Sequence, residues 1–390
     1  MSPRHLNLLG KPTHKPLALY DMWLMGAVLG LLFIGLMMVS SSSVMISVKH
    51  YHQPFYFLIR QSIYLLAGFG VALFILRVEI QQWEKMSMRL LLISLLLLFL
   101  VLIPGIGRTV NGARRWLALG PIHLQVSELV KLTLIFYVAG YLVRQQHNLG
   151  QTLFSFLKPI FILMIVSGLL LLEPDFGATV VSLGTVMAML FLAGVKFRYY
   201  LSLLSMVVLG LGVLAVSSSY RMARLTAFMN PWADQFNSGY QLTQSLIAFG
   251  RGGGMGVGLG ASIQKLFYLP EAHTDFLFAV LAEELGLIGV LLVLFLYSIL
   301  MLRGMMIGMV AYRQSKLFAA YMAYGLTCWL GLQAIINMGV NAGLFPTKGL
   351  TLPLLSYGGA SIIVNCIAIA LLLRVDHENR WQALGLKGMM

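Results

Sequence analysis

Charged residues are scarce in this chain of 390 residues, because only 10% are Asp, Glu, Lys or Arg. Soluble domains keep about a quarter of their residues charged, so the deficit excludes an ordinary water-exposed surface. Lipid offers no water to backbone polar groups, so only helices or closed barrels can span a bilayer. The hydrophobic residues, 59% of the chain, form runs too continuous for alternating barrel strands. The composition therefore predicts an all-α polytopic membrane protein.

Cysteine is also rare, and several signatures of catalysis or nucleotide binding are missing. Cys328 and Cys366 both lie in apolar runs, which predicts buried small side chains rather than a disulfide or metal pair. No metal-ligand spacing and no Gly-x-Ser-x-Gly or Ser-x-x-Lys nucleophile motif stands out. The glycine-dense run 250–260 lacks the Gly-Lys-Ser/Thr of a P-loop, so we expect a tight or flexible turn there.

Acidic residues are fewer than basic ones, with 13 Asp and Glu against 27 Lys and Arg, and the formal net charge is +14. In a soluble protein this excess would suggest a nucleic-acid partner. Here most basic residues fall in short connections between apolar runs, as the positive-inside rule expects of cytoplasmic loops. We therefore expect contact with membrane lipid and none with nucleic acid.

Ten apolar runs approach the roughly 20 residues that a membrane-spanning helix needs. They cover residues 22–46, 61–77, 89–103, 127–143, 158–173, 178–195, 199–217, 276–302, 317–340 and 356–374. The first run is too long for a cleaved signal peptide, which predicts an uncleaved span. The distribution of Lys and Arg predicts that both termini lie on the cytoplasmic side. We expect cytoplasmic tails at 1–21 and 376–390 and a single membrane domain at 22–375.

Three longer segments are predicted on the outer side, at about 104–126, 218–275 and 341–355, and the largest joins spans 7 and 8. They carry basic residues that the positive-inside rule disfavours there. Eight of the 13 acidic residues lie on the outer side or within spans: Glu128, Glu173, Asp175, Asp234, Glu271, Asp275, Glu283 and Glu284. Ionisable groups at membrane depth are costly and usually functional, so the functional surface is expected to face outward.

The segment 268–286 holds the strongest candidate for chemistry. Pro270 suits the first turn of a helix, which would place Glu271 and Asp275 four residues apart on one face. A carboxylate at the point where the chain enters the membrane is partly desolvated, which raises its pKa and makes it a better base. A plainer interpretation is that both carboxylates only complement the helix dipole. The titratable residues clustered nearby favour Asp275 as a functional base.

A second set of charges is predicted inside the membrane. Glu283 would lie about 12 Å deeper along the helix than Asp275, at about 1.5 Å per residue, and needs a partner. Lys131 is a candidate because it also lies in an apolar run, although Glu128 could pair with it first. With Glu284, these residues are expected to form a structural network rather than a catalytic one.

Two outer segments combine cations with residues suited to the membrane surface. Arg114 and Arg115 precede Trp116, and arginine binds phosphate through a planar fork while tryptophan suits the interface. An anchor that only touches lipid headgroups fits the same residues equally well. Lys348, beside prolines and glycines, could pair with Asp275, contact a phosphate or extend to the membrane surface.

Taken together, these segments resemble the SEDS family of peptidoglycan glycosyltransferases over residues 20 to 375. The motifs that carry the resemblance occur in consistent order: Asn111–Trp116, Gln125–Lys131, Glu173–Gly177, Asn230–Trp232, Gly239–Ser245, the run 250–260, Pro270–Glu284, Pro346–Gly349 and Ser356–Gly359. Residues 262–266 and the Glu173–Phe176 form favour the cell-division branch over the elongation branch. The chain departs from the family at Val126, where proline is usual, and at Glu173, where many members have glutamine.

The resemblance implies an enzyme that polymerises lipid II into β-1,4 glycan strands at the septum and releases undecaprenyl diphosphate. It matches Asp275 to the catalytic aspartate of the family. The expected substrate-binding residues are Arg108, Arg114, Arg115, Trp116, Arg221, Glu271, His273, Lys348 and Ser356. No protein metal site is expected, and a divalent cation, Mg²⁺ or Mn²⁺, is a candidate for assisting the diphosphate. The expected partners are a monofunctional class B penicillin-binding transpeptidase and other membrane proteins of the divisome.

Two other functions stay open. Ten spans with Glu and Lys inside the membrane also suit a lipid II flippase, but a transporter should bind its substrate near the midplane. The unusual residues here lie in the outer segments, which favours the enzyme. A scaffold that only recruits division proteins is the third possibility, and it would tolerate the loss of Asp275.

Overall fold

The structure is a computed structural model that describes residues 20–110, 113–119, 122–146, 154–217 and 219–384. Most of the predicted N-terminal tail 1–21, the residue Asn111 and the last residues of the predicted C-terminal tail lie outside these ranges.

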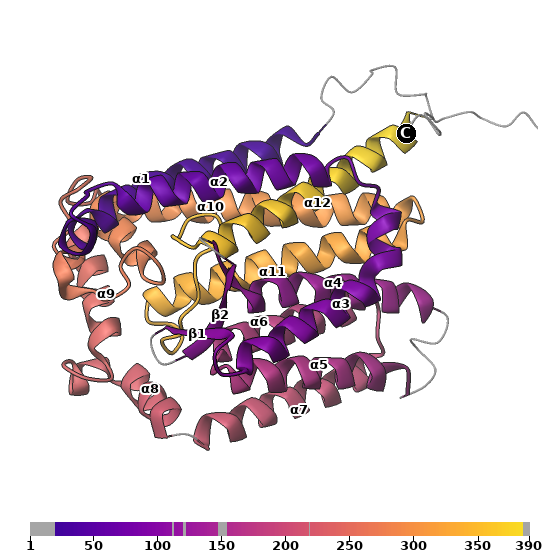
Figure 1. The fold of residues 1–390 in the computed structure, drawn as a ribbon, viewed down its shortest axis with the longest axis horizontal. Helices are drawn as coiled ribbons and strands as arrows, with labels where there is room; N and C mark the ends of the chain where they lie inside the picture. The colour runs from indigo at the N-terminus through magenta and orange to yellow at the C-terminus, as the bar shows by residue number, and fades with distance from the viewer. Residues whose placement is uncertain (1–19, 111–112, 120–121, 147–153, 218, 385–390) are drawn as a thin grey trace, which may run out of the picture.

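Helices dominate the described residues (Figure 1). Seven are long and apolar enough to cross a membrane: α1 (Met22–Tyr51), α2 (Tyr56–Ile75), α3 (Ile80–Leu102), α4 (Val126–Arg144), α10 (Leu277–Arg313), α11 (Leu317–Asn341) and α12 (Gly359–Ala383). Three further helices with shorter apolar stretches are α5 (Phe154–Leu172), α6 (Phe176–Leu192) and α7 (Phe197–Val216). A helix occupies the place of each predicted run, so the all-α polytopic class is confirmed.

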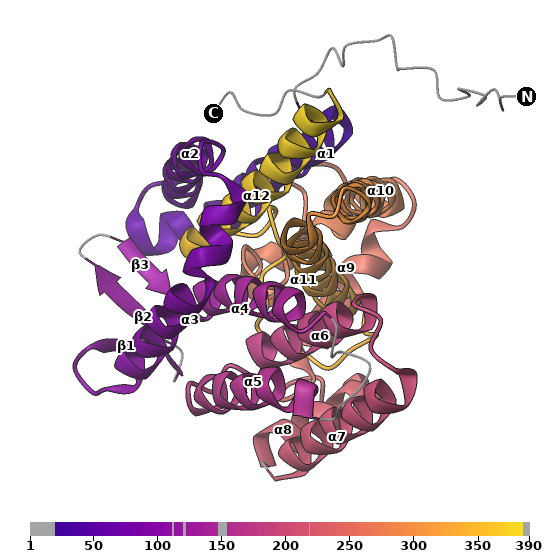
Figure 2. The same cartoon turned by 90° about the vertical axis from the view of Figure 1, so that its right-hand side faces the viewer.

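Helix α11 lies at the centre of the bundle, where it packs against α10, α6 and α4 (Figure 2). Its Trp329 side chain is fully buried, and Gly325 allows Ile135 of α4 and Met189 of α6 to approach closely. The outer helices instead expose apolar side chains such as Leu66 and Phe295. This is the pattern of a membrane bundle, in which lipid covers the outer apolar faces.

The C-terminal ends of α10 and α12 extend beyond the predicted spans. Helix α10 continues past residue 302, and α12 continues past the predicted domain end at residue 375. Charged side chains hold these extensions together: the Asp21 carboxylate at the start of α1 pairs with Arg303 of α10 and lies 3.8 Å from Arg380 of α12. The beginning of α1 and the end of α12 therefore meet on the same side of the bundle.

The outer segment 104–126 contains a small antiparallel sheet that the sequence did not predict. Its strands, in spatial order, are β1 (Gly107–Val110), β2 (Ala113–Leu119) and β3 (Ile122–Gln125). Trp116 is paired with Arg108 on one side and with Gln125 on the other. The sheet leads directly into α4, so it fixes where side chains of β2 lie relative to the helix ends.

The long segment 218–275 is mostly helical. It contains α8 (Ser219–Met229), a short 3₁₀ turn at Pro231–Asp234, α9 (Tyr240–Gly252) and a π-helical turn at Gln264–Tyr268. Helices α8 and α9 lie at the end of the molecule opposite the C-terminus (Figure 1).

The glycine run after α9 packs tightly against α10 at a break in that helix. Gly286 interrupts α10 with φ 64°, and a Cβ atom there would lie 2.3 Å from the Gly256 nitrogen. Across this contact, Val257 N donates to the Glu283 carbonyl at 3.0 Å, and Leu287 N donates to the Gly253 carbonyl at 3.0 Å. The glycines are therefore needed for close approach of two backbones, which agrees with the tight turn expected.

Candidate active site

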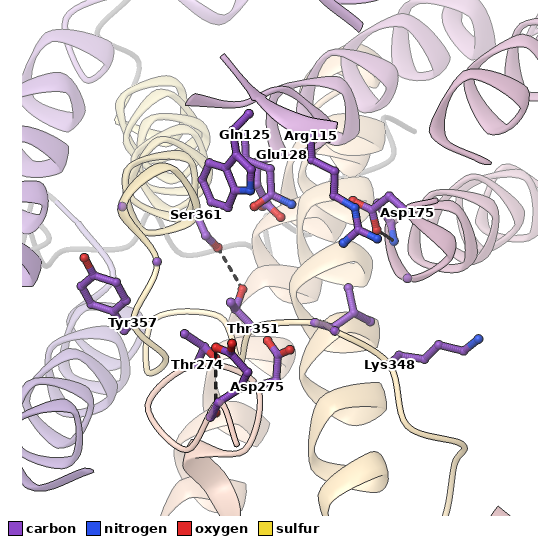
Figure 3. A pocket seen from close by; sticks show the side chains of 18 of the residues that line it. Arg115, Gln125, Glu128, Asp175, Thr274, Asp275, Lys348, Thr351, Tyr357 and Ser361 are labelled. Carbon is purple, nitrogen blue, oxygen red and sulfur yellow. Dashed lines mark hydrogen bonds between the residues drawn. The ribbon is translucent and has the colours of Figure 1, made fainter. Parts of the chain in front are cut away.

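The outer ends of the helices enclose a cavity of about 1040 Å³. Its walls come from α2, the sheet, the turn between α5 and α6, the turn before α10 and the segment 347–359. The charged residues that line it are Arg60, Arg108, Arg115, Glu128, Asp175, Arg224, Glu271, Asp275 and Lys348. Figure 3 shows Asp275 and Thr274 on one side of this space and Arg115 and Glu128 on the other.

Asp275 lies in a series of turns immediately before α10, which begins at Leu277. The prediction that a helix starts at Pro270 was wrong, because Glu271 adopts the left-handed conformation with φ 57°. Phe276 N instead donates to the Glu271 carbonyl at 3.2 Å, which closes the turn. Glu271 and Asp275 both line the cavity through this turn rather than through a shared helix face.

Two asparagines of α11 fix the main chain at Asp275. The Asp275 carbonyl accepts hydrogen bonds from Asn337 Nδ2 at 2.9 Å and from Asn341 Nδ2 at 3.0 Å. Asn341 Oδ1 also accepts from Ala279 N at 3.1 Å, which ties the first turn of α10 to the same residue. The sequence analysis missed both asparagines, although two amides four residues apart in an apolar run are a usable signal.

The surroundings of Asp275 suit a general base. Burial raises the pKa of Asp275 to about 7, and the nearby Glu271 carboxylate acts in the same direction. Arg115 and Arg224 oppose the shift. A carboxyl group with a pKa near neutral is ionised in about half of the molecules at pH 7 and is basic enough to accept a proton from an alcohol in a transition state.

Cationic side chains approach the cavity from three different elements. Arg115 of β2 donates from Nε to the Glu173 carbonyl at 3.1 Å and from Nη2 to the Pro174 carbonyl at 2.5 Å. Arg224 of α8 donates to the Thr347 carbonyl at 3.1 Å. Both arginines are thus held at the cavity by hydrogen bonds to neutral carbonyl oxygens.

The position of the Lys348 ammonium group does not support the predicted ion pair with Asp275. Its ammonium lies 3.7 Å from the centroid of the Phe176 ring, and Figure 3 shows the side chain extending away from Asp275. A lysine over an aromatic face is stabilised by the ring quadrupole. Lys348 still lines the cavity, so contact with an anionic substrate stays a prediction.

Three predicted substrate-binding residues lie away from the cavity lining. Arg114 donates to the Leu102 carbonyl at the end of α3 at 3.0 Å. His273 is buried, with ring centroids 4.6 Å from Phe57 and 5.7 Å from Tyr357, and burial lowers its pKa. The Ser356 hydroxyl accepts from Leu352 N at 2.9 Å within its own turn. These roles are structural, so we do not assign substrate contact to them.

The remaining predicted binding residues divide into two groups. Arg108, Arg115, Trp116 and Glu271 line the cavity together with Asp275. The side chain of Arg221, in α8, lies outside the described part of the structure. Arg224 lies about one turn further along α8, and its side chain is described and lines the cavity.

The predicted intramembrane network forms, but with one different pairing. Lys131 Nζ lies 2.8 Å from Glu128 Oε1 and 2.7 Å from Gln333 Oε1, which confirms the Glu128–Lys131 pair. The prediction that Lys131 partners Glu283 was wrong, because Arg251 Nη1 lies 2.5 Å from Glu283 Oε1. Ser262 and the backbone N–H of residues 263 and 264 also donate to Glu283.

Glu284 belongs to a neighbouring ion pair. Its Oε1 lies 2.7 Å from Lys265 Nζ, and the Ser41 hydroxyl of α1 donates to the same carboxylate at 2.7 Å. This pair and the Glu283 contacts join the π-helical turn and the glycine run to α10, close behind the turn that carries Asp275. The structural role of the two glutamates stays a prediction, and their ion-pair partners come from the segment 218–275.

The lining also includes polar residues that the sequence analysis did not assign. Asp175 caps α6 by accepting from Ala178 N at 3.1 Å. Thr351 and Ser361 hydroxyls lie 3.3 Å apart at the cavity, and burial raises the pKa of the lining residue Tyr357 to about 12, so it stays protonated. Within the described ranges, no group of three or more His, Cys, Asp or Glu side chains is arranged to hold a metal ion.

The fold and the cavity define a multi-pass membrane protein with acids and cations gathered at one end of a helix bundle. Residues 22–381 match the family model for the cell cycle proteins FtsW, RodA and SpoVE, and the chain belongs to this family.

Curated relatives and solved structures agree with that assignment. The chain is 70% identical over 387 residues, covering 99% of itself and 98% of the relative, to the "probable peptidoglycan glycosyltransferase FtsW" of Legionella pneumophila. It is 56% identical over 359 residues to the protein of the same name from Coxiella burnetii, covering 92% and 96% of the two chains.

Among solved structures, the chain resembles a component of a peptidoglycan synthase complex with a TM-score of 0.77 and 30% identity, covering 93% of this chain and 99% of the other. It also resembles the rod shape determining protein RodA of Thermus thermophilus with a TM-score of 0.68 and 30% identity, covering 93% and 98%.

Proposed function

We propose that this chain is a peptidoglycan glycosyltransferase of the cell-division branch, which polymerises lipid II into β-1,4 glycan strands and releases undecaprenyl diphosphate. The names of its curated relatives support the reaction class and the branch. The observation that carries the proposal is the Asp275 carboxylate, which lies at the edge of a large cavity among cations and has a pKa of about 7, on a residue whose main-chain carbonyl is held by Asn337.

In the proposed step, ionised Asp275 accepts the proton of the 4-hydroxyl group of a GlcNAc residue. The oxygen then attacks the anomeric carbon of a MurNAc residue whose C1 is bonded to the lipid diphosphate. The bond from C1 to the phosphate oxygen breaks as the new bond forms, so one displacement inverts the anomeric centre and gives a β linkage. The proton stays on the carboxyl group until solvent removes it.

The cations stabilise the leaving group in this scheme. Negative charge grows on the diphosphate as the glycosidic bond breaks, and positioned cations in a partly dry site are well suited to stabilise it. Arg115, Arg224 and Lys348 supply that charge from three elements, and Arg108 adds a fourth cation nearer the surface. A Mg²⁺ or Mn²⁺ ion carried by the diphosphate stays a prediction, and no step here depends on it.

The replacement Asp275→Asn tests the base. Removing a general base typically costs about 10²- to 10⁴-fold, so we expect the purified variant to form less than about a hundredth of the glycan that the unaltered protein makes from labelled lipid II. Asp234→Asn is the matched control, because Asp234 is an outer aspartate bonded within its own turn to Ser238 at 2.5 Å. Full polymerisation by a folded, membrane-inserted Asp275→Asn protein would refute the assignment.

The same experiment separates the enzyme from its alternatives. A flippase should bind near the midplane, whereas the cavity described here opens among the outer segments. Transbilayer movement of lipid II in vesicles without polymer would favour the flippase. Normal division with Asp275→Asn would favour a scaffold.

The family and one structural neighbour support proposals for the partner and the location. A fold similar to this one occurs in a peptidoglycan synthase complex. We propose that the chain works in the bacterial inner membrane at the division septum, with cytoplasmic termini, together with a class B penicillin-binding transpeptidase and other divisome proteins. Polymerisation assays should therefore be run with and without that transpeptidase.

A further inference from the structure

Glu173 lies next to the cavity, and the proposed mechanism gives this acidic residue no role. It lies in the turn between α5 and α6, and its side chain is fully buried. Within the described residues, neither of its carboxyl oxygens has a hydrogen-bond partner. A buried carboxylate without a partner is very costly, so an acid in this position is expected to be protonated.

The charged groups around Glu173 reinforce this state. Asp175 lies on the same turn and is itself buried, and burial together with Asp175 raises the pKa of Glu173 to about 8. Arg115 of β2 acts in the opposite direction. Helix α4, which packs against α5 and α6, carries Glu128 and Lys131, but these are already paired with each other.

The main chain of the same residue holds a cation of the proposed active site. Arg115 donates to the carbonyl oxygens of Glu173 and Pro174. Arg115 lines the cavity, whereas Glu173 does not. The guanidinium therefore spans the turn from the cavity side, close to a carboxyl group buried behind it. An ionised carboxylate so near would attract the Arg115 guanidinium, whose positive charge already lowers the pKa of Glu173.

We propose that Glu173 is a positioning residue that works as a neutral acid, because only its uncharged form leaves the Arg115 guanidinium on the carbonyl oxygens of residues 173 and 174 and available to an anion in the cavity. This inference rests on the proposed function for its anion, the lipid diphosphate. When Glu173 loses its proton, Arg115 turns towards the buried carboxylate and the cavity loses one cation.

The expected consequence is a second limb in the pH profile of polymerisation. The rate should rise through about pH 7 as Asp275 ionises and should fall above about pH 8 as Glu173 ionises. At pH 9 about 90% of a group with a pKa of about 8 is ionised, so the unaltered protein should work about sixfold more slowly there than at its maximum near about pH 7.5.

The replacement Glu173→Gln keeps the shape of the neutral acid and removes its titration. We expect the variant to rise through pH 7 as before but to keep its plateau rate, within about twofold, at pH 9. Glu79→Gln is the control, because Glu79 makes no side-chain capping bond at the start of α3 and should retain the fall. Arg115→Gln should be slower at every pH and should also lack the fall, since the residue through which Glu173 acts is gone.

A measurement that does not need turnover keeps the two proposals separate. In the Asp275→Asn background, infrared difference spectra should contain the carbonyl band of a protonated carboxylic acid that fades near pH 8 and is missing after Glu173→Gln. An alkaline fall that persists unchanged in Glu173→Gln, or the absence of this band, overturns the inference. Absence of polymer from the unaltered protein at every pH, with the band present, would overturn the proposed function and leave the protonation of Glu173 standing.

Discussion

Replacing Gly349 by alanine tests whether the Asp275 carboxylate must keep its present position. A Cβ atom at residue 349 would lie 3.2 Å from Asp275 Oδ2, and no other atom is as close. Contacts this short are rare, so the carboxylate would have to move by a few tenths of an ångström. The main chain cannot follow, because Asn337 and Asn341 hold the Asp275 carbonyl.

The expected loss of kcat in Gly349→Ala can be worked out from this displacement. A displacement of 1 Å at a reacting group can lower a rate about 100-fold, so a few tenths should lower kcat about 3- to 10-fold. The added methyl group does not touch the arginines of the cavity by this measure, so KM for lipid II should stay within about twofold. The assay is initial-rate polymerisation of labelled lipid II at varied concentration.

Gly250→Ala is the matched control for this experiment. Gly250 lies in α9 with no atom within 4 Å of its added Cβ, so alanine should be accepted and should stabilise the helix by up to about 1 kcal/mol. Unaltered kcat in Gly349→Ala would refute the view that the carboxylate position limits the rate. A loss confined to KM would also refute it.

Two other contrasts follow from the contacts around the site. Arg115→Gln should lower turnover and move the acid limb of the pH profile to higher pH, because the Arg115 charge lowers the pKa of Asp275. Arg114→Gln is the control and should leave that limb in place. An equal shift in both variants would contradict this assignment. Lys265→Met should destabilise the protein by about 3–5 kcal/mol, and combining it with Glu284→Leu should restore part of the loss, because the double variant buries no unpaired charge. Thermal unfolding in detergent measures the coupling, and strictly additive effects would argue against a buried pair.

The membrane helices could be predicted because lipid imposes a length and an apolar composition on every span. The C-terminal ends of α10 and α12 could not, since α10 continues past Arg303 and α12 past Asp376, charged residues that interrupt the apolar runs, and contacts such as Asp21 with Arg303 hold these ends. The sheet at residues 107–125 was missed for a related reason. It is short and carries no long alternating pattern that would distinguish it from a loop.

The candidate site was predictable in its residue types and less so in its geometry. Asp275 was identified because a carboxylate at the point where the chain enters the membrane is costly and because it matches the family motif, and Arg115 because basic residues are disfavoured on the outer side. The local rule that proline starts a helix failed at Glu271, whose left-handed backbone turns the chain instead. The partner of Glu283 also could not be found, because Arg251 reaches it only after the glycine run folds back on α10.

The amides of Asn337 and Asn341 give the site a property that its charged groups cannot provide. An amide does not titrate, so the bonds that anchor residue 275 persist while protons come and go on the carboxyl groups nearby. Placement of the base is thereby separated from its ionisation. Replacing a neighbouring charged residue can therefore change the pKa of the Asp275 carboxyl group without moving its main chain.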